Sequence, residues 1–228
     1  MAMDFCLFLE LSRPTAAARC PEFDALMSAV PACTAALVHT PAQARDPFLD
    51  DGAPPALVLQ LYFARLLDME SAAARGGAVA RLAEALAGET GAAPRWEAML
   101  TRRLDVPAPR RAEDAGPWCT YLVAYEGPAE DANVWMHHYL TQHPPLMRQL
   151  PGLRELEICT SIDAVAFVPG RRVRHLQRNK VAFDSATALD AALQSPVREQ
   201  MRRDFTAFPP FAGGVAHHAM VTRRLQAG

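Results

Sequence analysis

The stretch Trp118-Cys-Thr-Tyr-Leu-Val-Ala-Tyr125 is an apolar strand that begins a second pass through an order of elements already present in the first half of the chain. Each pass reads as a strand, a helix, two strands, a helix and a strand. A βαββαβ unit of about half the chain, used twice, predicts a duplicated fold. In the first pass we expect strands at Met3–Leu11, Pro31–Thr40, Ala56–Phe63 and Trp96–Leu104, with a helix at Asp68–Ala87. In the second pass we expect strands at Trp118–Tyr125, after Pro151-Gly152, at Lys180–Phe183 and from Val215. Its helices begin at Asn133 and run from Ser185 to Phe205.

Composition places the chain among globular proteins and gives no electrostatic reason for a nucleic-acid or membrane partner. Its 228 residues are 50% hydrophobic, which suits one large domain or two small ones. The formal net charge is −2, and no apolar run approaches the roughly 20 residues of a membrane span. The N-terminus lacks the pattern of a signal peptide, so we expect a cytoplasmic protein with free thiols. The five thiols, which form no metal-binding spacing, are Cys6, Cys20, Cys33, Cys119 and Cys159.

A proline-rich stretch, Val106–Pro117, separates the two passes. Its prolines, glycine and mixed charges cannot continue a helix or a central strand. We therefore expect a first unit at 1–105, a linker at 106–117 and a second unit at 118–228. Loops at matching positions of the two units, Arg45–Pro55 and Ala164–Asn179, agree with a repeat.

Apolar and aromatic side chains recur every three or four residues along both expected helices of the second unit, which predicts one buried stripe on each. Ser195-Pro196 has the form of an N-cap followed by proline at the first helical position, so we expect the second helix to restart there. The stripes are Trp135, Tyr139, His143, Leu146 and Leu150 on the first helix, and Leu189, Leu193, Met201 and Phe205 on the second.

Tyr139 and His143, the polar members of the first stripe, are the candidate acid–base pair. Pro144 disfavours helical geometry at the residue before it, so we expect the helix to end or kink at His143 and to open a gap against the sheet. An imidazole and a phenol at such a gap suit proton transfer, because imidazole titrates near neutral pH. The alternative is a half-buried structural histidine whose ring bonds to a loop carbonyl.

Two groups of residues in the second unit form ordered motifs: Tyr139-x-x-x-His143-x-Pro145-Leu146…Leu150-Pro151-Gly152-Leu153, and Ala182-Phe-Asp-Ser185…Ala192-Leu-Gln-Ser-Pro196…Asp204…Phe208. Together they resemble the EthD-like branch of the dimeric α/β-barrel superfamily, here in a tandem-repeat form. The resemblance covers most of residues 118–224. The first unit matches only in outline, since no histidine precedes Val30-Pro31 where that pair stands in place of Leu150-Pro151.

The resemblance implies an α+β protein of two ferredoxin-like βαββαβ units, packed sheet to sheet as a pseudo-dimer of the dimeric α/β-barrel type. Ligands in this superfamily lie between sheet and helices, which puts His143 at the pocket as the acid–base group with Tyr139 beside it. Relatives include lactone isomerases, cofactor-free monooxygenases, polyketide cyclases and haem-degrading enzymes. In the first unit we expect apolar side chains such as Phe23, Leu26 and Met27 to fill the matching place.

The remaining substrate-binding candidates are Tyr121, Trp135, His217 and His218. The two histidines alternate across the final strand, so one of them faces the helices and could reach the His143 region. Histidines from a helix and a strand could in principle bind a metal, and a single histidine could bind haem. No local motif supports either group, and no flavin or nicotinamide motif is present, so we expect no cofactor.

The basic run Arg171–Lys180 indicates a solvated loop or edge strand, or one arginine that binds a substrate carboxylate. Together with the resemblance, the sequence predicts a small-molecule enzyme, acting on a hydrophobic aromatic or lactone-like compound by isomerisation, cyclisation or oxygenation in bacterial catabolism or secondary metabolism. The alternative is a non-catalytic protein that binds a hydrophobic metabolite in the same cavity. The expected partner is a small hydrophobic molecule, and a homodimer beyond the intrachain pairing is left open.

Overall fold

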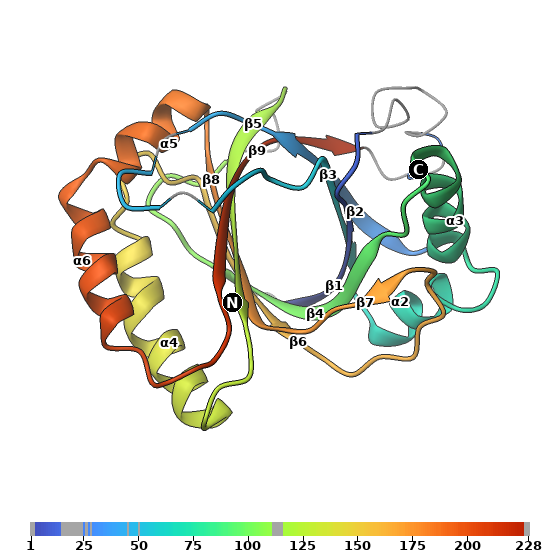
Figure 1. The fold of residues 1–228 in the computed structure, drawn as a ribbon. Helices are drawn as coiled ribbons and strands as arrows, with labels where there is room; N and C mark the ends of the chain where they lie inside the picture. Colours follow the sequence, from blue (N-terminus) through green and yellow to red (C-terminus); the bar gives the residue numbers. More distant parts are fainter. Residues whose placement is uncertain are drawn as a thin grey trace.

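The structure, a computed structural model, describes residues 3–14, 25, 27, 29–44, 46–49, 51–110 and 116–225. Within these residues the strands are β1 (Met3–Leu11), β2 (Cys33–Pro41), β3 (Leu57–Phe63), β4 (Arg95–Leu104), β5 (Trp118–Glu126), β6 (Glu155–Ser161), β7 (Arg171–Arg172), β8 (His175–Phe183) and β9 (Val215–Leu225). They form one sheet in the order β1-β3-β2-β9-β5-β8-β6-β4-β7. Because β1 also pairs with β4, eight of these strands close into an antiparallel barrel (Figure 1). The expected α+β class is confirmed and every expected strand is present, but the expected loop Ala164–Asn179 contains β7 and the start of β8. The expectation of a solvated loop or edge strand at Arg171–Lys180 is wrong from His175 onward, because β8 pairs on both sides, with β5 and β6, and buries Arg178 and Lys180.

Each half of the chain supplies four neighbouring strands, in the order β4-β1-β3-β2 and β9-β5-β8-β6. The halves meet where β2 pairs with β9 and where β4 pairs with β6. The expectation of two sheets packed face to face therefore needs correction, since the sheets join edge to edge. A separate sheet would leave two edges of unpaired N–H and C=O groups, and closure of the barrel satisfies them.

Helices cover the barrel on two opposite sides (Figure 1). On one side lie α2 (Leu66–Ala72) and α3 (Ala78–Thr90), and on the other lie α4 (Ala132–Met147), α5 (Ala186–Leu193) and α6 (Pro196–Thr206). None of the helices in the described part of the chain is both long and apolar enough to cross a membrane.

The single helix expected at Asp68–Ala87 is divided into α2 and α3 by Gly76 and Gly77. Gly76 has a φ of +66°, which favours glycine, and a Cβ on Gly77 would lie 2.4 Å from the carbonyl oxygen of Ala72. The chain reverses tightly there, so the apolar pattern continues while the helix does not.

Helix α4 does not end at His143, as the sequence suggested, but continues through Pro144 and Pro145 to Met147. The fixed φ of proline suits a helix, and the cost lies in two missing N–H donors and in crowding of the preceding turn. Burial of His143, Pro144 and Met147 against the rest of the protein offsets that cost. At its start the helix is capped by Asp131, whose carboxylate accepts the N–H groups of residues 133 and 134.

The predicted restart at Ser195-Pro196 is confirmed, because α5 ends at Leu193 and α6 begins at Pro196. Ser195 occupies the N-cap position, but its hydroxyl donates to the carbonyl of Ala192 instead of accepting from the new helix. Phe205, expected on the buried stripe, is 39% exposed.

Along each strand, successive side chains point alternately toward the outer helices and toward the barrel interior. On β8, Val181 and Phe183 belong to the apolar core beneath α4–α6, whereas Ala182 belongs to a separate core inside the barrel. A third core packs beneath α2 and α3 and includes Met27. Phe23 and Leu26, also expected to fill this half, lie outside the described residues. The proposed domain boundaries remain a prediction.

Candidate functional site

A cavity of about 470 Å³ lies between the outer face of the second-half strands and helices α4–α6. Most of its wall is apolar or aromatic, as is typical of pockets for small hydrophobic molecules. The polar side chains that interrupt this wall determine what chemistry it can support. They are Tyr121, Tyr125, His143, Asn179, Arg198, Arg202, Thr206 and His217.

His143 lies on the cavity wall, and its ring forms a hydrogen bond with the carboxylate of Asp204. Its Nδ1 is 2.7 Å from Asp204 Oδ2, and the histidine side chain is only 5% exposed. The other carboxylate oxygen of Asp204 lies 3.4 Å from His138 Nε2. Helix α4 thus presents both imidazoles to one carboxylate on α6, which fixes the orientation of the His143 ring.

The second ring nitrogen of His143, Nε2, has no hydrogen-bond partner among the described residues. With Nδ1 occupied by Asp204, the neutral ring carries its proton on Nδ1 and leaves Nε2 as a base. An imidazole oriented by a carboxylate and open to a cavity is the arrangement of a general base. Among the described residues, neither ring nitrogen of His143 bonds to a main-chain carbonyl.

Tyr139 and Trp135 are adjacent to the cavity but do not line it. Both are fully buried, and their rings stack on each other with centroids 5.3 Å apart. The Tyr139 hydroxyl accepts a 2.7 Å hydrogen bond from Asn179 Nδ2 and donates weakly to Met147 Sδ at 3.9 Å. Tyr139 is one turn from His143, with ring centroids 5.2 Å apart, so it supports the histidine ring instead of facing a ligand.

Asn179 on β8 brings a buried polar group to the cavity that sequence reasoning did not single out. Its Nδ2 is used by Tyr139, but its Oδ1 has no partner among the described residues. The amide of Gln177, two residues earlier on the same face, also has no partner there. Buried polar atoms are costly to leave unpaired, so this face of β8 is suited to receive a ligand donor or water.

His217 and His218 separate as alternation requires. His217 pairs across the strands with Val123 and lines the cavity, whereas His218 pairs with Leu122, a member of the core inside the barrel. His217 Nδ1 lies 2.7 Å from Asp51 Oδ2. Burial lowers the pKa of His217, and the nearby Asp51 carboxylate only partly opposes this effect. His217 is therefore neutral near pH 7 and better suited to hydrogen bonding than to charge.

A segment of the first half closes the cavity of the second. Asp46 receives hydrogen bonds from both Nε and Nη2 of Arg198, at 3.0 and 2.9 Å, and from the Tyr121 hydroxyl at 3.0 Å. Burial, reinforced by the charge of Asp46, raises the pKa of Tyr121 far above its ordinary value, so this phenol stays protonated. Phe48 of the same segment also lines the cavity. No motif pointed to Asp46, Phe48 or Arg198.

The described residues contain no group of three or more histidine, cysteine, aspartate or glutamate side chains that could hold a metal ion. The carboxylate–histidine pairs that do exist join residues far apart in the chain, so no local sequence pattern could have predicted them.

Fold and site together define a class of protein: an α+β protein with an eight-stranded antiparallel barrel and a largely apolar cavity between the barrel and its outer helices. No protein-family model matches this sequence, and no curated protein matches it significantly. Solved structures share the fold. An anthrone oxidase-like protein is 14% identical with a TM-score of 0.65, over 98% of this chain and 93% of its own.

Two bacterial proteins described as proposed monooxygenases also superpose. The one from Fusobacterium nucleatum is 6% identical with a TM-score of 0.59, over 99% of this chain and 94% of its own. The one from Lactobacillus acidophilus is 12% identical with a TM-score of 0.50, over 99% of this chain and 95% of its own. At these identities the likeness shows the fold, and the function has to be argued from the site.

Proposed function

We propose that this protein is a small-molecule enzyme in which His143 acts as general acid and base on a hydrophobic aromatic or lactone-like compound. The observation that carries the proposal is the His143–Asp204 pair in the wall of an apolar cavity. The reaction would be an isomerisation, a cyclisation or an oxygenation. The ordered motifs around Tyr139–Leu153 support a relationship to the EthD-like branch, and the names of the fold neighbours make an oxidoreductase role worth testing first.

In this mechanism His143 Nε2 removes a proton from a C–H or O–H group of the bound compound. Asp204, bonded to Nδ1, stabilises the imidazolium that forms, in the way an orienting carboxylate does beside a catalytic histidine. Arg198 lines the same cavity and donates to Asp46 from only two of its three side-chain nitrogens, so its guanidinium can also stabilise the substrate anion. Asn179 Oδ1 can accept a hydrogen bond from a substrate hydroxyl.

For oxygenation, the carbanion left by proton loss reacts with O₂ directly and needs no other oxidant. Anthrone is a suitable probe because its methylene proton is acidic. One O₂ converts the methylene of anthrone to the second carbonyl of anthraquinone and releases one water. The methylene carbon loses two protons and four electrons, and O₂ accepts those four electrons in forming the carbonyl oxygen and the oxygen of the water.

We also propose that the two βαββαβ halves are tandem ferredoxin-like units that form an intrachain pseudo-dimer, with the second half carrying the site. The equivalent strand orders β4-β1-β3-β2 and β9-β5-β8-β6 support this. A cytoplasmic role in catabolism, without a resident cofactor, completes the proposal.

The test is turnover of anthrone, followed by anthraquinone absorbance and oxygen uptake, in the wild type and in His143→Gln. We expect the variant to lose about two to four powers of ten in kcat/KM, the usual contribution of a positioned acid–base group. His137→Gln is the matched control, because His137 lies on the exposed face of the same helix. It should keep wild-type turnover.

Equal turnover by wild type and His143→Gln would overturn the acid–base role. The rival function, a non-catalytic binding protein, is favoured by the largely apolar cavity wall. It predicts that a co-purified ligand, identified by mass spectrometry, binds equally well to both proteins and is not converted by either.

A further inference from the structure

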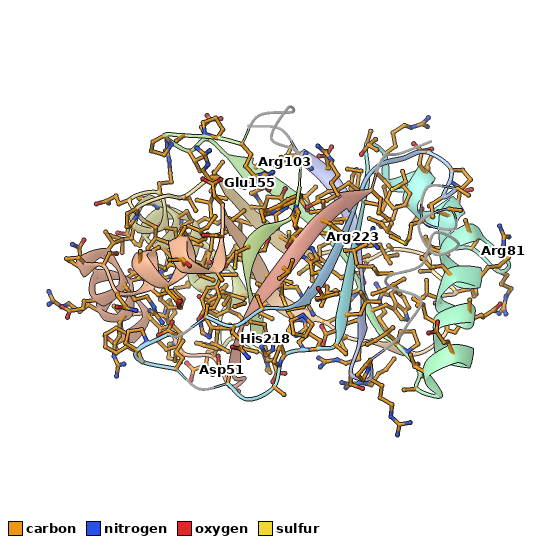
Figure 2. All side chains as sticks on the ribbon, turned by 90° about the horizontal axis from the view of Figure 1, so that it is seen from above. Asp51, Arg81, Arg103, Glu155, His218 and Arg223 are labelled. Carbon is orange, nitrogen blue, oxygen red and sulfur yellow. The ribbon has the colours of Figure 1, made fainter. Side chains whose placement is uncertain are left out.

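A second cavity, of about 980 Å³, opens at one end of the barrel and is lined by strands from both halves. Figure 2 shows Arg103 and Glu155, which line it, toward one end of the molecule, and Asp51 and His218 toward the opposite end. It is distinct from the His143 cavity because the two lie on opposite faces of β8. Lys180 faces this second cavity, whereas its neighbours Asn179 and Val181 line the first.

Charges are already balanced in the deep part of this second cavity. Lys180 is 2% exposed, and its Nζ lies 3.2 Å from carboxylate oxygens of both Glu155 and Glu157 and 3.0 Å from the Tyr62 hydroxyl. Burial alone would lower the pKa of Lys180, but the charges of Glu157 and Glu155 outweigh it and raise the pKa. Lys180 is therefore a permanent ammonium group and not an amine nucleophile, which excludes imine chemistry here.

Glu157 is equally well satisfied. The Tyr62 hydroxyl donates to its Oε2 at 2.7 Å, and Arg103 Nε donates to its Oε1 at 3.1 Å. Arg103 also pairs with Asp4. These groups hold strands β1, β3, β4, β6 and β8 together, and they leave no charge at the base of the cavity that requires a ligand.

The rim carries more cationic than acidic side chains, although some of its arginines are paired: Arg110 lies 3.9 Å from a carboxylate oxygen of Glu155 and 4.0 Å from one of Asp184. Six residues that line the cavity are cationic and four are acidic, and four of the cations are rim arginines. Arg154 bonds to Asp184 at 2.9 Å and to the carbonyl of Ala108 at 3.1 Å, so Asp184 offsets part of the excess. The guanidinium of Arg224 has no hydrogen bond or ion pair within the described residues. The rim arginines are Arg110, Arg154, Arg223 and Arg224.

Trp118 adds a neutral donor at the same place. Its side chain lines the cavity and is 7% exposed, yet its indole N–H has no partner among the described residues. Arg110 lies over the ring, with its guanidinium carbon 4.4 Å from the centroid. A buried N–H left unpaired beside an excess of guanidinium groups is suited to an oxygen ligand with negative charge.

We propose that the barrel mouth binds the oxyanion group, phosphate or carboxylate, of a small molecule through Arg224, Arg110 and the indole N–H of Trp118. This site is independent of the chemistry proposed for His143. Residues 111–115 lie outside the described residues, and the proposal includes none of them.

Isothermal titration of the full-length protein at low salt tests the proposal, with pyrophosphate as the phosphate probe and citrate as the carboxylate probe. Arg224→Gln should weaken binding of the preferred probe about tenfold or more, the usual effect of losing a charge-assisted hydrogen bond. Trp118→Phe keeps the ring and removes the N–H, and should weaken binding by a smaller factor. Arg81→Gln is the control, since Arg81 is an exposed residue of α3 far from the cavity (Figure 2).

Two results would overturn the proposal. One is that neither probe binds at concentrations up to about 10 mM. The other is that binding is the same in wild type, Arg224→Gln and Trp118→Phe, which would identify an adventitious ion only. His143→Gln should bind the probes like wild type, so loss of the proposed catalytic function and loss of this site can be told apart.

Discussion

His39 is a buried histidine whose protonation makes the stability of the folded protein depend on pH. It is fully enclosed, its Nδ1 lies 2.8 Å from Thr222 Oγ1, and that hydroxyl in turn donates to Thr120 Oγ1 at 2.6 Å. Burial, together with the positive charge of Lys180, lowers the pKa of His39 from its ordinary 6.5 to about 3. The interior therefore holds His39 as the neutral imidazole.

This predicts a loss of stability in mild acid. Between pH 6.5 and 3 the unfolded chain protonates His39 and the folded protein does not, so the stability is full above pH 6.5 and falls as the pH drops through this window. The loss from His39 alone is about 2 kcal/mol between pH 7 and pH 5. Urea unfolding at the two pH values measures it.

In His39→Gln this contribution should disappear, so the difference between the two pH values should shrink even if the variant is less stable overall. His137→Gln, which removes an exposed histidine, is the matched control. The same pH dependence in His39→Gln and wild type would show that His39 is protonated in the folded state.

At the scale of an element, the segment from Asp46 to Asp51 acts as a wall of a cavity built by the other half of the chain. Asp46 is 4% exposed and Arg198 is 10% exposed in their ion pair, whereas Asp163 and Arg174 form a pair with exposures of 88% and 54%. Buried charge pairs are weakened little by solvent, so the first pair should hold its segment and the second should contribute little.

Asp46→Asn should therefore loosen this segment. Hydrogen bonds to a charged group are worth about 1.5–3 kcal/mol, so amide exchange in the peptide containing Asp51 should become about 10- to 100-fold faster. Hydrogen-exchange mass spectrometry measures it, and Asp163→Asn is the matched control. Unchanged exchange in Asp46→Asn would show that apolar contacts such as those of Phe48 hold the segment without the ion pair.

For the whole molecule, closure of the barrel makes the two halves depend on each other. Edge strands β9 and β6 of the second half are covered by β2 and β4 of the first. An open sheet with two long edges would expose its interior side chains and its unpaired backbone groups. A second copy could supply the missing edges, as in a homodimer of single units.

We expect residues 118–228, expressed alone, not to persist as a folded monomer. Sedimentation velocity and circular dichroism should show either a folded dimer or an unfolded chain. The full-length protein, measured under the same conditions, is the reference. A cooperatively folding monomer of 118–228 would show that the second half is stable without edge pairing.

Much of the element order could be predicted because its signals are local. The strand at Met3–Leu11 was predicted with the bounds it has, and Ser195-Pro196 marked the break between α5 and α6. Local rules failed where packing outweighed them. Pro144 and Pro145 did not end α4, since burial of the helix face compensated for the missing donors.

The sequence by itself determined the order of the strands, their apolar faces and the presence of His143 on a buried stripe, because these depend on residues a few positions apart. Only the tertiary structure decided that the sheets close into one barrel, that Asp204 meets His143 across 61 positions, and that Asp46 reaches Arg198 across 152. The physical reason is that such contacts depend on strand order and on which edges pair, and neither leaves a periodic signal in the chain.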